Sequence, residues 1–245
     1  MTAVVFILSL LTLVEIVLAL AAVHVTLRYH GLRVSESLCL APLALMAFYS
    51  VAIQLVFLLQ TAVLFPLVDL AAVVFSIRTV VRRWADLWRD AGAIHEFWRS
   101  HKGVGTAAFA AGMVYLAVQG LFLPPTNSDA MAYNLARVLL MMNEGKLFLD
   151  NCNTLSQANF PLGFDILHWL FLRFRSDWFA GLFSLLSYGS ILAGTWAMVS
   201  AAGFLPEERR RTLSLTCVFL VGSMTELVLQ ASSVKNDIPC AAAAV

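Results

Sequence analysis

The stretch Val4–Ala22, VVFILSLLTLVEIVLALAA, is a nearly unbroken apolar run close to the start of the chain. Its only polar side chains are Glu15 and the hydroxyls of Ser9 and Thr12. An α-helix needs about 20 such residues to cross the hydrocarbon layer of a membrane. No basic residue precedes the run, and it is too long for the apolar core of a secretory signal peptide. The stretch therefore predicts a retained transmembrane helix that extends to about Leu27.

The composition of the whole chain agrees with this start. Of 245 residues, 60% are hydrophobic and 13% are charged, whereas soluble domains carry roughly 25% charged residues. The mean hydropathy is +0.82. The net charge of +1 provides no overall field that would favour nucleic acid. These values predict an all-α, polytopic transmembrane helical bundle.

The remaining apolar segments predict five more spans. The tract Leu38–Val81 is too long for one straight helix, so we divide it near Gln60 and Thr61 into two spans joined by a tight turn. The segment Leu162–Phe174 is too short to cross alone, and we expect it to form a half-buried or interfacial helix. The other spans are expected at Val104–Leu123, Trp178–Ala202 and Leu213–Gln230.

Basic residues gather in three segments between these spans, around Arg28 and Arg33, in Arg78–Lys102 and in Arg209–Arg211. The tryptophans of the second segment recur at helical spacing, which predicts an amphipathic helix at the membrane interface. Because cytoplasmic loops carry an excess of Lys and Arg, we expect all three segments to be cytoplasmic. With six spans, the Pro124–Pro161 loop and the Ser232–Asp237 turn then share the opposite, non-cytoplasmic side.

The polar loop after the fourth span holds the first candidate site. Asn127 or Ser128 is expected to cap a helix that begins near Asp129 and lies flat on the membrane. Asp129 is then either a carboxylate favoured by the helix dipole or a reactive group, and its spacing alone favours the first interpretation. Arg137 and Lys146 either bind a lipid phosphate or simply extend to the headgroups, and without further evidence the second interpretation is favoured.

The turn Gln230–Asp237, QASSVKND, is the second candidate site. It places an amide, two hydroxyls, a cation and a carboxylate on the side where Asp129 is expected. An ordinary connecting turn has a similar composition. The following run, Ile238–Val245, supplies about 12 Å of helix at 1.5 Å per residue, against a hydrocarbon layer of about 30 Å. We therefore expect this chain to be an N-terminal portion that continues into a further span.

Ionisable side chains inside the predicted spans form a third set. Glu15, Asp69 and Glu226 are costly in lipid, which suggests function. We expect Glu15 and Asp69 to pair with polar neighbours or to lie near helix ends. Glu226 lies about one helical turn from Gln230 and is a candidate to line the same cavity. His168, on the short apolar segment, is a ligand, a base or a structural residue, and a lone interfacial histidine favours the structural role.

Several motifs are absent from the sequence. It has no metal-binding spacing, no phosphate-cradling glycine loop and no nucleophile elbow, so neither ATP nor a soluble nucleotide sugar is an expected substrate. Of the four cysteines, Cys152 stands alone in a polar loop. Cys39, Cys217 and Cys240 fall in apolar segments and are expected to be small buried hydrophobic residues. No disulfide framework is predicted.

Three segments together resemble a known family. PPTNSDAMAYNLARV (Pro124–Val138), FPLGFDILHWLF (Phe160–Phe171) and LQASSVKND (Leu229–Asp237) are similar in type and order to segments of the GT-C superfamily of membrane glycosyltransferases. The branch is the one related to protein mannosyltransferases and aminoarabinose transferases. The chain departs from the family pattern at three positions, with Ser128 in place of an aromatic residue, Asn134 in place of His and Ala136 in place of Pro.

The resemblance implies a GT-C-like fold and a catalytic role for Asp129, which corresponds to the acidic residue of the family's first catalytic loop. That residue faces the acceptor or a divalent metal such as Mg or Mn. The resemblance also implies a polyprenyl-phosphate-linked sugar donor. Residues 1–103 are then N-terminal spans with a basic cytoplasmic loop, and residues 104–245 are the GT-C-like core with its catalytic loop at 124–161, truncated at the C-terminus. Residues expected to contact the donor phosphate or substrate are Tyr133, Asn134, Arg137, Lys146, Lys235, Asn236 and Asp237.

This chemistry suits the residues present. Displacement of a lipid phosphate at a sugar carbon needs a base to take the proton of an acceptor hydroxyl or amine, and Asp129 is the candidate. It also needs cations for the leaving phosphate, for which Arg137, Lys146 and Lys235 are candidates. Acceptors would be a glycan, a lipid or a protein at a bacterial-type inner membrane. The alternatives are a transporter or flippase with a relay of intramembrane carboxylates, and a non-catalytic membrane scaffold.

Overall fold

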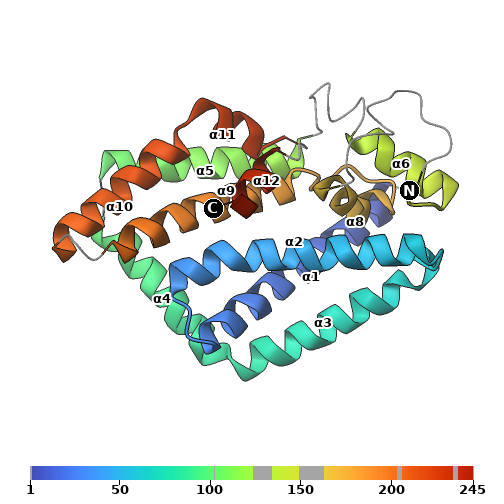
Figure 1. Cartoon of the computed structure of the whole chain (residues 1–245), viewed down its shortest axis with the longest axis horizontal. Coiled ribbons are helices and arrows are strands. Elements are labelled where there is room, and N and C mark those ends of the chain that lie inside the picture. The colour runs from blue at the N-terminus through green and yellow to red at the C-terminus, as the bar shows by residue number, and fades with distance from the viewer. Residues whose placement is uncertain are drawn as a thin grey trace.

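A computed structural model describes residues 2–101, 103–123, 134–148, 163–202, 206–233 and 237–244. Within these ranges the chain is helical and contains no strand (Figure 1). Five helices are long and apolar enough to cross a membrane, and a bent pair of helices makes a sixth. The prediction of an α-helical integral membrane protein is therefore confirmed.

Five predicted spans correspond closely to observed helices. The first and fourth differ from their predicted bounds by only a few residues, and the fifth begins later than expected, because residues 178–181 form a turn. The spans are α1 (Thr2–Tyr29), α2 (Val34–Leu58), α3 (Phe65–Arg82), α5 (Val104–Phe122) and α9 (Leu182–Ala201).

The turn between α2 and α3 lies where the sequence predicts it. Gln60 has a φ of 54°, and the Thr61 backbone N–H donates to the Val56 carbonyl at 2.7 Å. A short 3₁₀ helix, η1 (Ala62–Leu64), then leads into α3, which has a proline in its first turn. Proline is well tolerated there because the first N–H groups of a helix have no intrahelical acceptor. The division of the long apolar tract near Gln60 is thus confirmed.

The sixth predicted span is not one continuous helix. It consists of α10 (Glu207–Gly222) and α11 (Thr225–Ala231), which meet at an angle of 68°. Met224 is extended between them. The Tyr188 hydroxyl of α9 donates to the Gly222 carbonyl at 2.6 Å. A side-chain donor thereby satisfies a carbonyl that the broken helix leaves open, and the expectation of an uninterrupted span at Leu213–Gln230 is wrong.

The segment expected to lie half-buried or at the interface is instead fully packed in the core. It forms a 3₁₀ helix, η3 (Phe164–His168), and one turn of α-helix, α8 (Trp169–Leu172), and most of its side chains are buried. The main hydrophobic core joins this segment to α1, α2, α6 (Leu135–Glu144) and the start of α9. Aromatic contacts hold the segment in the core, since Trp169 lies edge-on to the rings of Phe57 and Phe65 at 5.5 and 4.7 Å between centroids.

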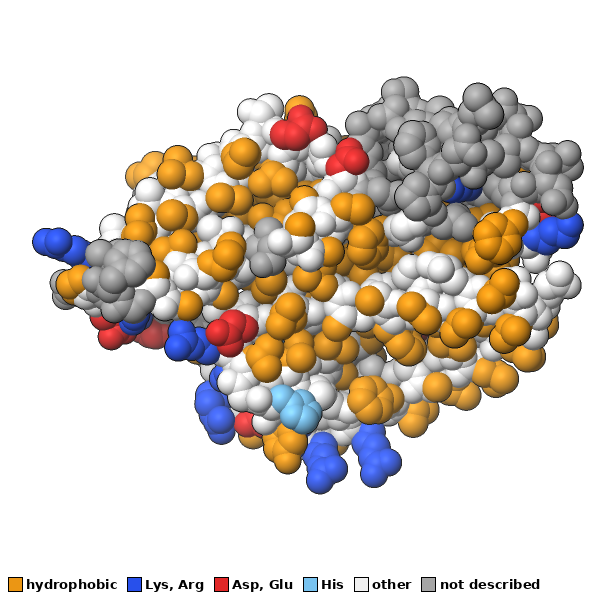
Figure 2. All heavy atoms as spheres, in the orientation of Figure 1, with side chains coloured by type: hydrophobic (Ala, Val, Ile, Leu, Met, Phe, Trp, Pro, Cys, Tyr) orange, Lys and Arg blue, Asp and Glu red, His pale blue; other side chains and the backbone are white. Residues whose placement is uncertain are grey.

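The loops gather at two opposite ends of the bundle (Figure 1). One end, at the left and lower left, holds the α1–α2 turn, the end of α3, α4 (Trp84–Ser100) and the α9–α10 connection. We call it the basic end, because the three arginine-rich segments lie there, and Figure 2 shows Lys and Arg side chains along its lower and left edges. The other end, which we call the loop end, holds the α2–α3 turn, α6, η3, the start of α9 and the start of α12 (Asp237–Ala244).

Helix α4 is anchored to the bundle by a buried carboxylate. Asp90 accepts hydrogen bonds from Arg28 at 2.8 and 3.1 Å and lies 3.2 Å from His24 Nε2. The other ring nitrogen of His24 lies 3.0 Å from the Ser37 hydroxyl. Burial raises the pKa of Asp90, but the hydrogen bonds and charges of Arg28 and His24 outweigh it and leave this pKa below its ordinary value. The predicted amphipathic helix is present, and one ion-paired side chain docks it against α1.

The order Ser37, His24, Asp90 has the residue types of a hydrolase triad but not its chemistry. The Ser37 hydroxyl is fully buried and donates to the Val34 carbonyl at 2.9 Å. A nucleophile must reach its substrate and pass its proton to the base. This serine does neither, so the group is a structural latch.

Candidate functional site

Two of the three segments that carry the family resemblance contact each other at the loop end through α6 and η3, and the third contacts the start of α9 there. The Gly181 N–H donates to the Gly120 carbonyl at 3.0 Å, and the Phe179 N–H donates to the Leu121 carbonyl at the same distance. These bonds hold the start of α9 against the end of α5, directly before Pro124. The Ser184 hydroxyl donates to the Ser233 carbonyl at 2.5 Å, which brings the QASS turn to the same place.

Glycine is required at this junction. A Cβ at Gly181 would lie 2.6 Å from the Gly120 carbonyl oxygen, and a Cβ at Gly120 would lie 2.9 Å from the Leu185 side chain. Side chains larger than hydrogen would therefore force the two helices apart. The close approach fixes where the polar loop leaves α5 relative to the turn that follows α11.

Backbone strain also gathers at the loop end. Among the described residues, the non-glycine positions with positive φ are Gln60, Arg175 and Phe179, with φ of 54°, 58° and 66°, and all three belong to this end. Such conformations cost of order 1–3 kcal/mol each and cluster at functional sites. The Phe179 ring is held by Phe6 of α1 and Phe122 of α5, at 6.3 and 5.9 Å between centroids.

A buried ion pair joins α6 to η3. Arg137 Nη1 lies 3.9 Å from Asp165 Oδ2, and the two side chains are 6% and 3% exposed. Helix α6 presents Arg137 inward together with its apolar face and ends at Gly145, whose left-handed conformation lets its N–H cap the Met141 carbonyl at 2.8 Å. A buried guanidinium needs such a partner because its desolvation is costly. The expectation that Arg137 reaches out to headgroups is therefore wrong.

His168 lies in the same core. Its ring contacts Phe183 at 5.9 Å between centroids, and its Nδ1 has no hydrogen-bond partner among the residues that the structure describes. Burial lowers the pKa of His168 from 6.5 to about 4, although a hydrogen bond with the Ala180 backbone acts in the opposite direction. The imidazole is thus neutral at physiological pH. A general base works best with a pKa near the operating pH, so this geometry favours the structural role.

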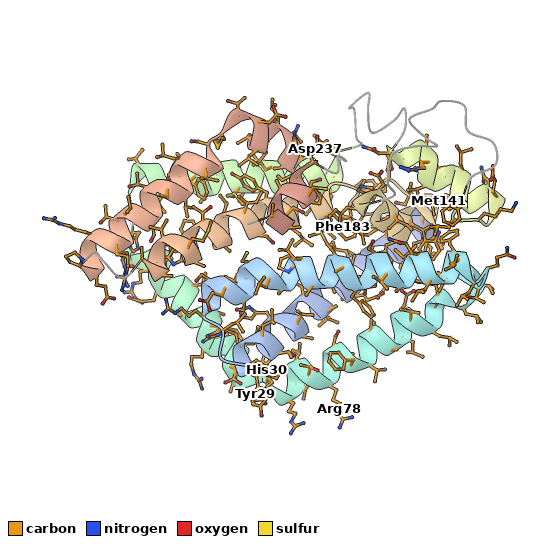
Figure 3. The ribbon with its side chains drawn as sticks, in the orientation of Figure 1. Tyr29, His30, Arg78, Met141, Phe183 and Asp237 are labelled. Carbon is orange, nitrogen blue, oxygen red and sulfur yellow. The ribbon has the colours of Figure 1, made fainter. Side chains whose placement is uncertain are left out.

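Helix α12 packs against α9 and α11. The pKa of the Cys240 thiol is raised by desolvation first and then by the negative charges of Asp237 and Asp165. Figure 3 shows Asp237 and Met141 along the same upper part of the molecule, beside the start of α12 and on α6.

The other predicted site residues are placed as follows. Lys146 is exposed, directly after the cap of α6, and Asp237 is exposed at the start of α12. Asn134 is buried at the start of α6. Asp129, Tyr133, Lys235 and Asn236 lie outside the described residues, as do Cys152 and the helix cap expected at Asn127 or Ser128.

The cysteines differ partly from expectation. Cys39 is buried and Cys217 is half-buried, but Cys240 is exposed on α12. All three are free thiols. In the described ranges, no cluster of three or more His, Cys, Asp or Glu side chains could hold a metal ion.

The intramembrane carboxylates form a pair of contacts and not a relay. Arg173 Nη1 lies 2.8 Å from Asp69 Oδ2, and the Tyr49 hydroxyl donates to Glu15 at 2.5 Å. Glu15, Asp69 and Arg173 line one cavity of about 290 Å³. Glu226 is exposed on α11 and accepts a hydrogen bond from Gln230. The expected pairing of Glu15 and Asp69 with polar neighbours is confirmed, whereas Glu226 does not join them.

Two features of these sites escaped the sequence analysis. The pairing of Arg137 with Asp165 joins segments that are far apart in sequence, and only the proximity of Asp165 to His168 on one short segment signalled a polar group there. The latch at Asp90 had no signal other than a carboxylate within a basic segment.

No protein-family model, curated protein or solved structure matches this chain.

Proposed function

We propose that this protein is a GT-C-type membrane glycosyltransferase, which moves a sugar from a polyprenyl-phosphate donor to an acceptor hydroxyl or amine. The reaction takes place on the non-cytoplasmic face of a bacterial-type inner membrane. One observation supports this proposal above the others, namely that described parts of the three resembling segments lie at one end of the bundle, where Arg137 pairs with Asp165 and the Ser233 carbonyl accepts a hydrogen bond from Ser184. The arginine-rich segments lie at the opposite end.

In the proposed reaction, Asp129 takes the acceptor proton, or holds a divalent metal that polarises the acceptor. The new bond forms at the anomeric carbon of the sugar as the bond from that carbon to the phosphate oxygen breaks. The polyprenyl phosphate leaves with the electron pair. Its charge needs cations nearby, and we assign this role to Lys146, which is exposed, and to Lys235.

Arg137 receives a different role in this proposal. Because it is buried and ion-paired with Asp165, it holds η3 against α6 and does not bind the leaving phosphate. Asn134 belongs to the same buried layer. Tyr133, Asn236 and Asp237 remain the proposed contacts to sugar or acceptor.

The transporter alternative has less support from the geometry. A proton or ion relay needs carboxylates within reach of one another along a path. Glu15 and Asp69 share a cavity, but Glu226 is exposed on a different helix. The loop-end contacts, by contrast, serve a site built from several loops.

The test is transfer of labelled sugar in reconstituted membranes. The protein is placed in proteoliposomes with a panel of radiolabelled polyprenyl-phosphate sugars and an extract of envelope acceptors. We expect Asp129→Asn to lower transfer by roughly 10²–10⁴, the usual contribution of a positioned base. Asparagine keeps the size of the side chain and still caps a helix, so the substitution changes stability by only a few tenths of a kcal/mol.

The matched control is Asp177→Asn, which removes an exposed carboxylate from the same end of the bundle but outside the three segments. It should retain full transfer. Wild-type transfer by the Asp129→Asn protein would show that Asp129 is only a helix cap and would remove the catalytic assignment.

A further inference from the structure

A second polar pocket lies at the basic end, opposite α6 and η3. It is a cavity of about 310 Å³ between the C-terminal ends of α1 and α3, lined by Thr26 and Tyr29 of α1, by Phe75, Arg78, Thr79 and Arg82 of α3, and by Arg83 after it. In Figure 3, Tyr29 and Arg78 lie together at the lower edge of the molecule. Neither the resemblance nor the proposed reaction uses these residues.

The pocket carries positive charge that the protein does not neutralise. Arg78 and Arg82 lie four residues apart, so they share one face of α3. Both are exposed, and neither makes a hydrogen bond or ion pair with a residue that the structure describes. Arg83 is committed elsewhere, because it stacks 3.9 Å from the Tyr29 ring centroid and pairs with Asp86 at 3.7 Å.

The hydroxyls of the pocket differ in what they can donate. The Thr26 hydroxyl donates to the Ala22 carbonyl at 2.7 Å, so its proton is occupied. The Thr79 hydroxyl makes no hydrogen bond with a residue that the structure describes, so its proton is available to a ligand. The two guanidinium groups and the Thr79 hydroxyl thus offer donors that meet no acceptor among the residues that the structure describes. Such a set matches the oxygens of a phosphate group.

The apolar surroundings distinguish a lipid from a soluble anion. Phe75 lines the pocket one turn closer to the centre of the span, and it is 59% exposed. Further along α3, Leu70, Val74 and Leu67 are also exposed to the surroundings. A ligand with its phosphate between Arg78 and Arg82 would therefore lay hydrocarbon chains along this side of α3. Basic pockets at helix ends on the cytoplasmic side are suited to anionic lipid headgroups.

We propose that this pocket binds the phosphate headgroup of an anionic phospholipid. Arg78 and Arg82 hold the phosphate oxygens, Thr79 donates a third hydrogen bond, and Phe75 with the outer face of α3 contacts the first part of the acyl chains. The inference is independent of the glycosyltransferase proposal.

The test measures lipid retention by native mass spectrometry of the whole protein, released from vesicles of phosphatidylglycerol mixed with phosphatidylcholine. The double variant Arg78→Gln/Arg82→Gln should bind phosphatidylglycerol about 30-fold more weakly, at roughly a fivefold loss for each cation near the surface. The control double variant, Arg89→Gln/Arg99→Gln, removes the same charge from exposed positions of α4. Its loss of affinity for phosphatidylglycerol should be at least tenfold smaller than that of the Arg78→Gln/Arg82→Gln variant. Equal losses in the two variants would mean that only a diffuse field attracts lipid, and would overturn the site.

Two further arms separate the remaining explanations. Thr79→Val keeps the shape and charge of the pocket, and it should weaken phosphatidylglycerol binding about tenfold, the loss expected for a hydrogen bond to a charged group. No effect of Thr79→Val would contradict the proposed geometry. Inorganic phosphate and glycerol phosphate at millimolar concentration should not displace the lipid. Displacement by either would overturn the assignment to a lipid in favour of a soluble phosphate.

Discussion

Replacing Asp90 with alanine should release helix α4 from the bundle. Asp90 is almost fully buried, with 6% of its side chain exposed, and it faces Arg28 through hydrogen bonds of 2.8 and 3.1 Å and His24 at 3.2 Å. Removal of one partner from a buried ion pair typically costs 3–5 kcal/mol. Because the Arg28 side chain is 29% exposed, water offsets part of this loss, and we expect about 3 kcal/mol for the docking of α4.

Amide hydrogen exchange of the protein in nanodiscs measures this docking directly. A loss of about 3 kcal/mol corresponds to a fall of about 150-fold in the protection of α4 amides. The matched control is Asp86→Ala on the same helix. Asp86 is 36% exposed and pairs with Arg83 and Arg89 at 3.7 and 3.3 Å, and surface pairs of this kind contribute at most about 1 kcal/mol. If Asp90→Ala and Asp86→Ala lower protection equally, the latch is not what holds α4.

The same latch gives a pH dependence with a definite sign. The pKa of Asp90 is lower in the folded protein than its ordinary value. A carboxylate of this kind stabilises the fold at pH values above its unfolded pKa of about 4, and its contribution is lost as the pH falls through the lower folded pKa. Protection of α4 should therefore decrease below about pH 4 in the wild type, and Asp90→Ala should lack this step.

Two other changes test the loop end. Burial holds the pKa of His168 near 4 instead of 6.5. Its contribution to the free energy of unfolding is therefore complete above pH 6.5 and decreases by about 3 kcal/mol as the pH falls to 4. His168→Gln should remove this pH dependence from thermal or urea unfolding curves, and an unchanged profile would contradict the argument. Gly181→Ala should lower the free energy of unfolding by about 2 kcal/mol through overpacking, because the new Cβ would lie 2.6 Å from the Gly120 carbonyl oxygen. Gly189→Ala, in open space on the same helix, should be neutral or slightly stabilising, and similar melting temperatures for the two alanine variants would refute the close-approach argument.

Length and polarity alone predicted most of the membrane architecture. The first span, the turn at Gln60 and the amphipathic helix that carries Trp84 all appear where the pattern placed them. Each depends on local features, namely the run length, a polar interruption and the periodicity of tryptophan. Counting the spans between the basic segments and the polar loops also predicted that the two kinds of loop lie at opposite ends of the bundle.

The side-chain pairs that join distant segments could not be predicted in this way. Arg137 looked like an exposed cation on a flat helix because its partner, Asp165, lies on a different element. The break after Gly222 was not predicted either, although Ser223, Thr225 and Glu226 interrupt the apolar run there, because the length of the whole stretch fitted one span. Its stability depends on the Tyr188 hydroxyl from a neighbouring helix. Local pattern carries no information about such partners.

The 68° break between α10 and α11 bears on how the chain enters the membrane during synthesis. At 1.5 Å per residue, the 16 residues of α10 cover about 24 Å, less than the hydrocarbon thickness of about 30 Å. A helix that stops there leaves open carbonyls, which cost several kcal/mol each in lipid. Tyr188 supplies one donor from α9, which leaves the ribosome before α10. The two helices are therefore expected to pass from the translocation channel into lipid as a hairpin, so that co-translational insertion of α10 depends on its neighbour.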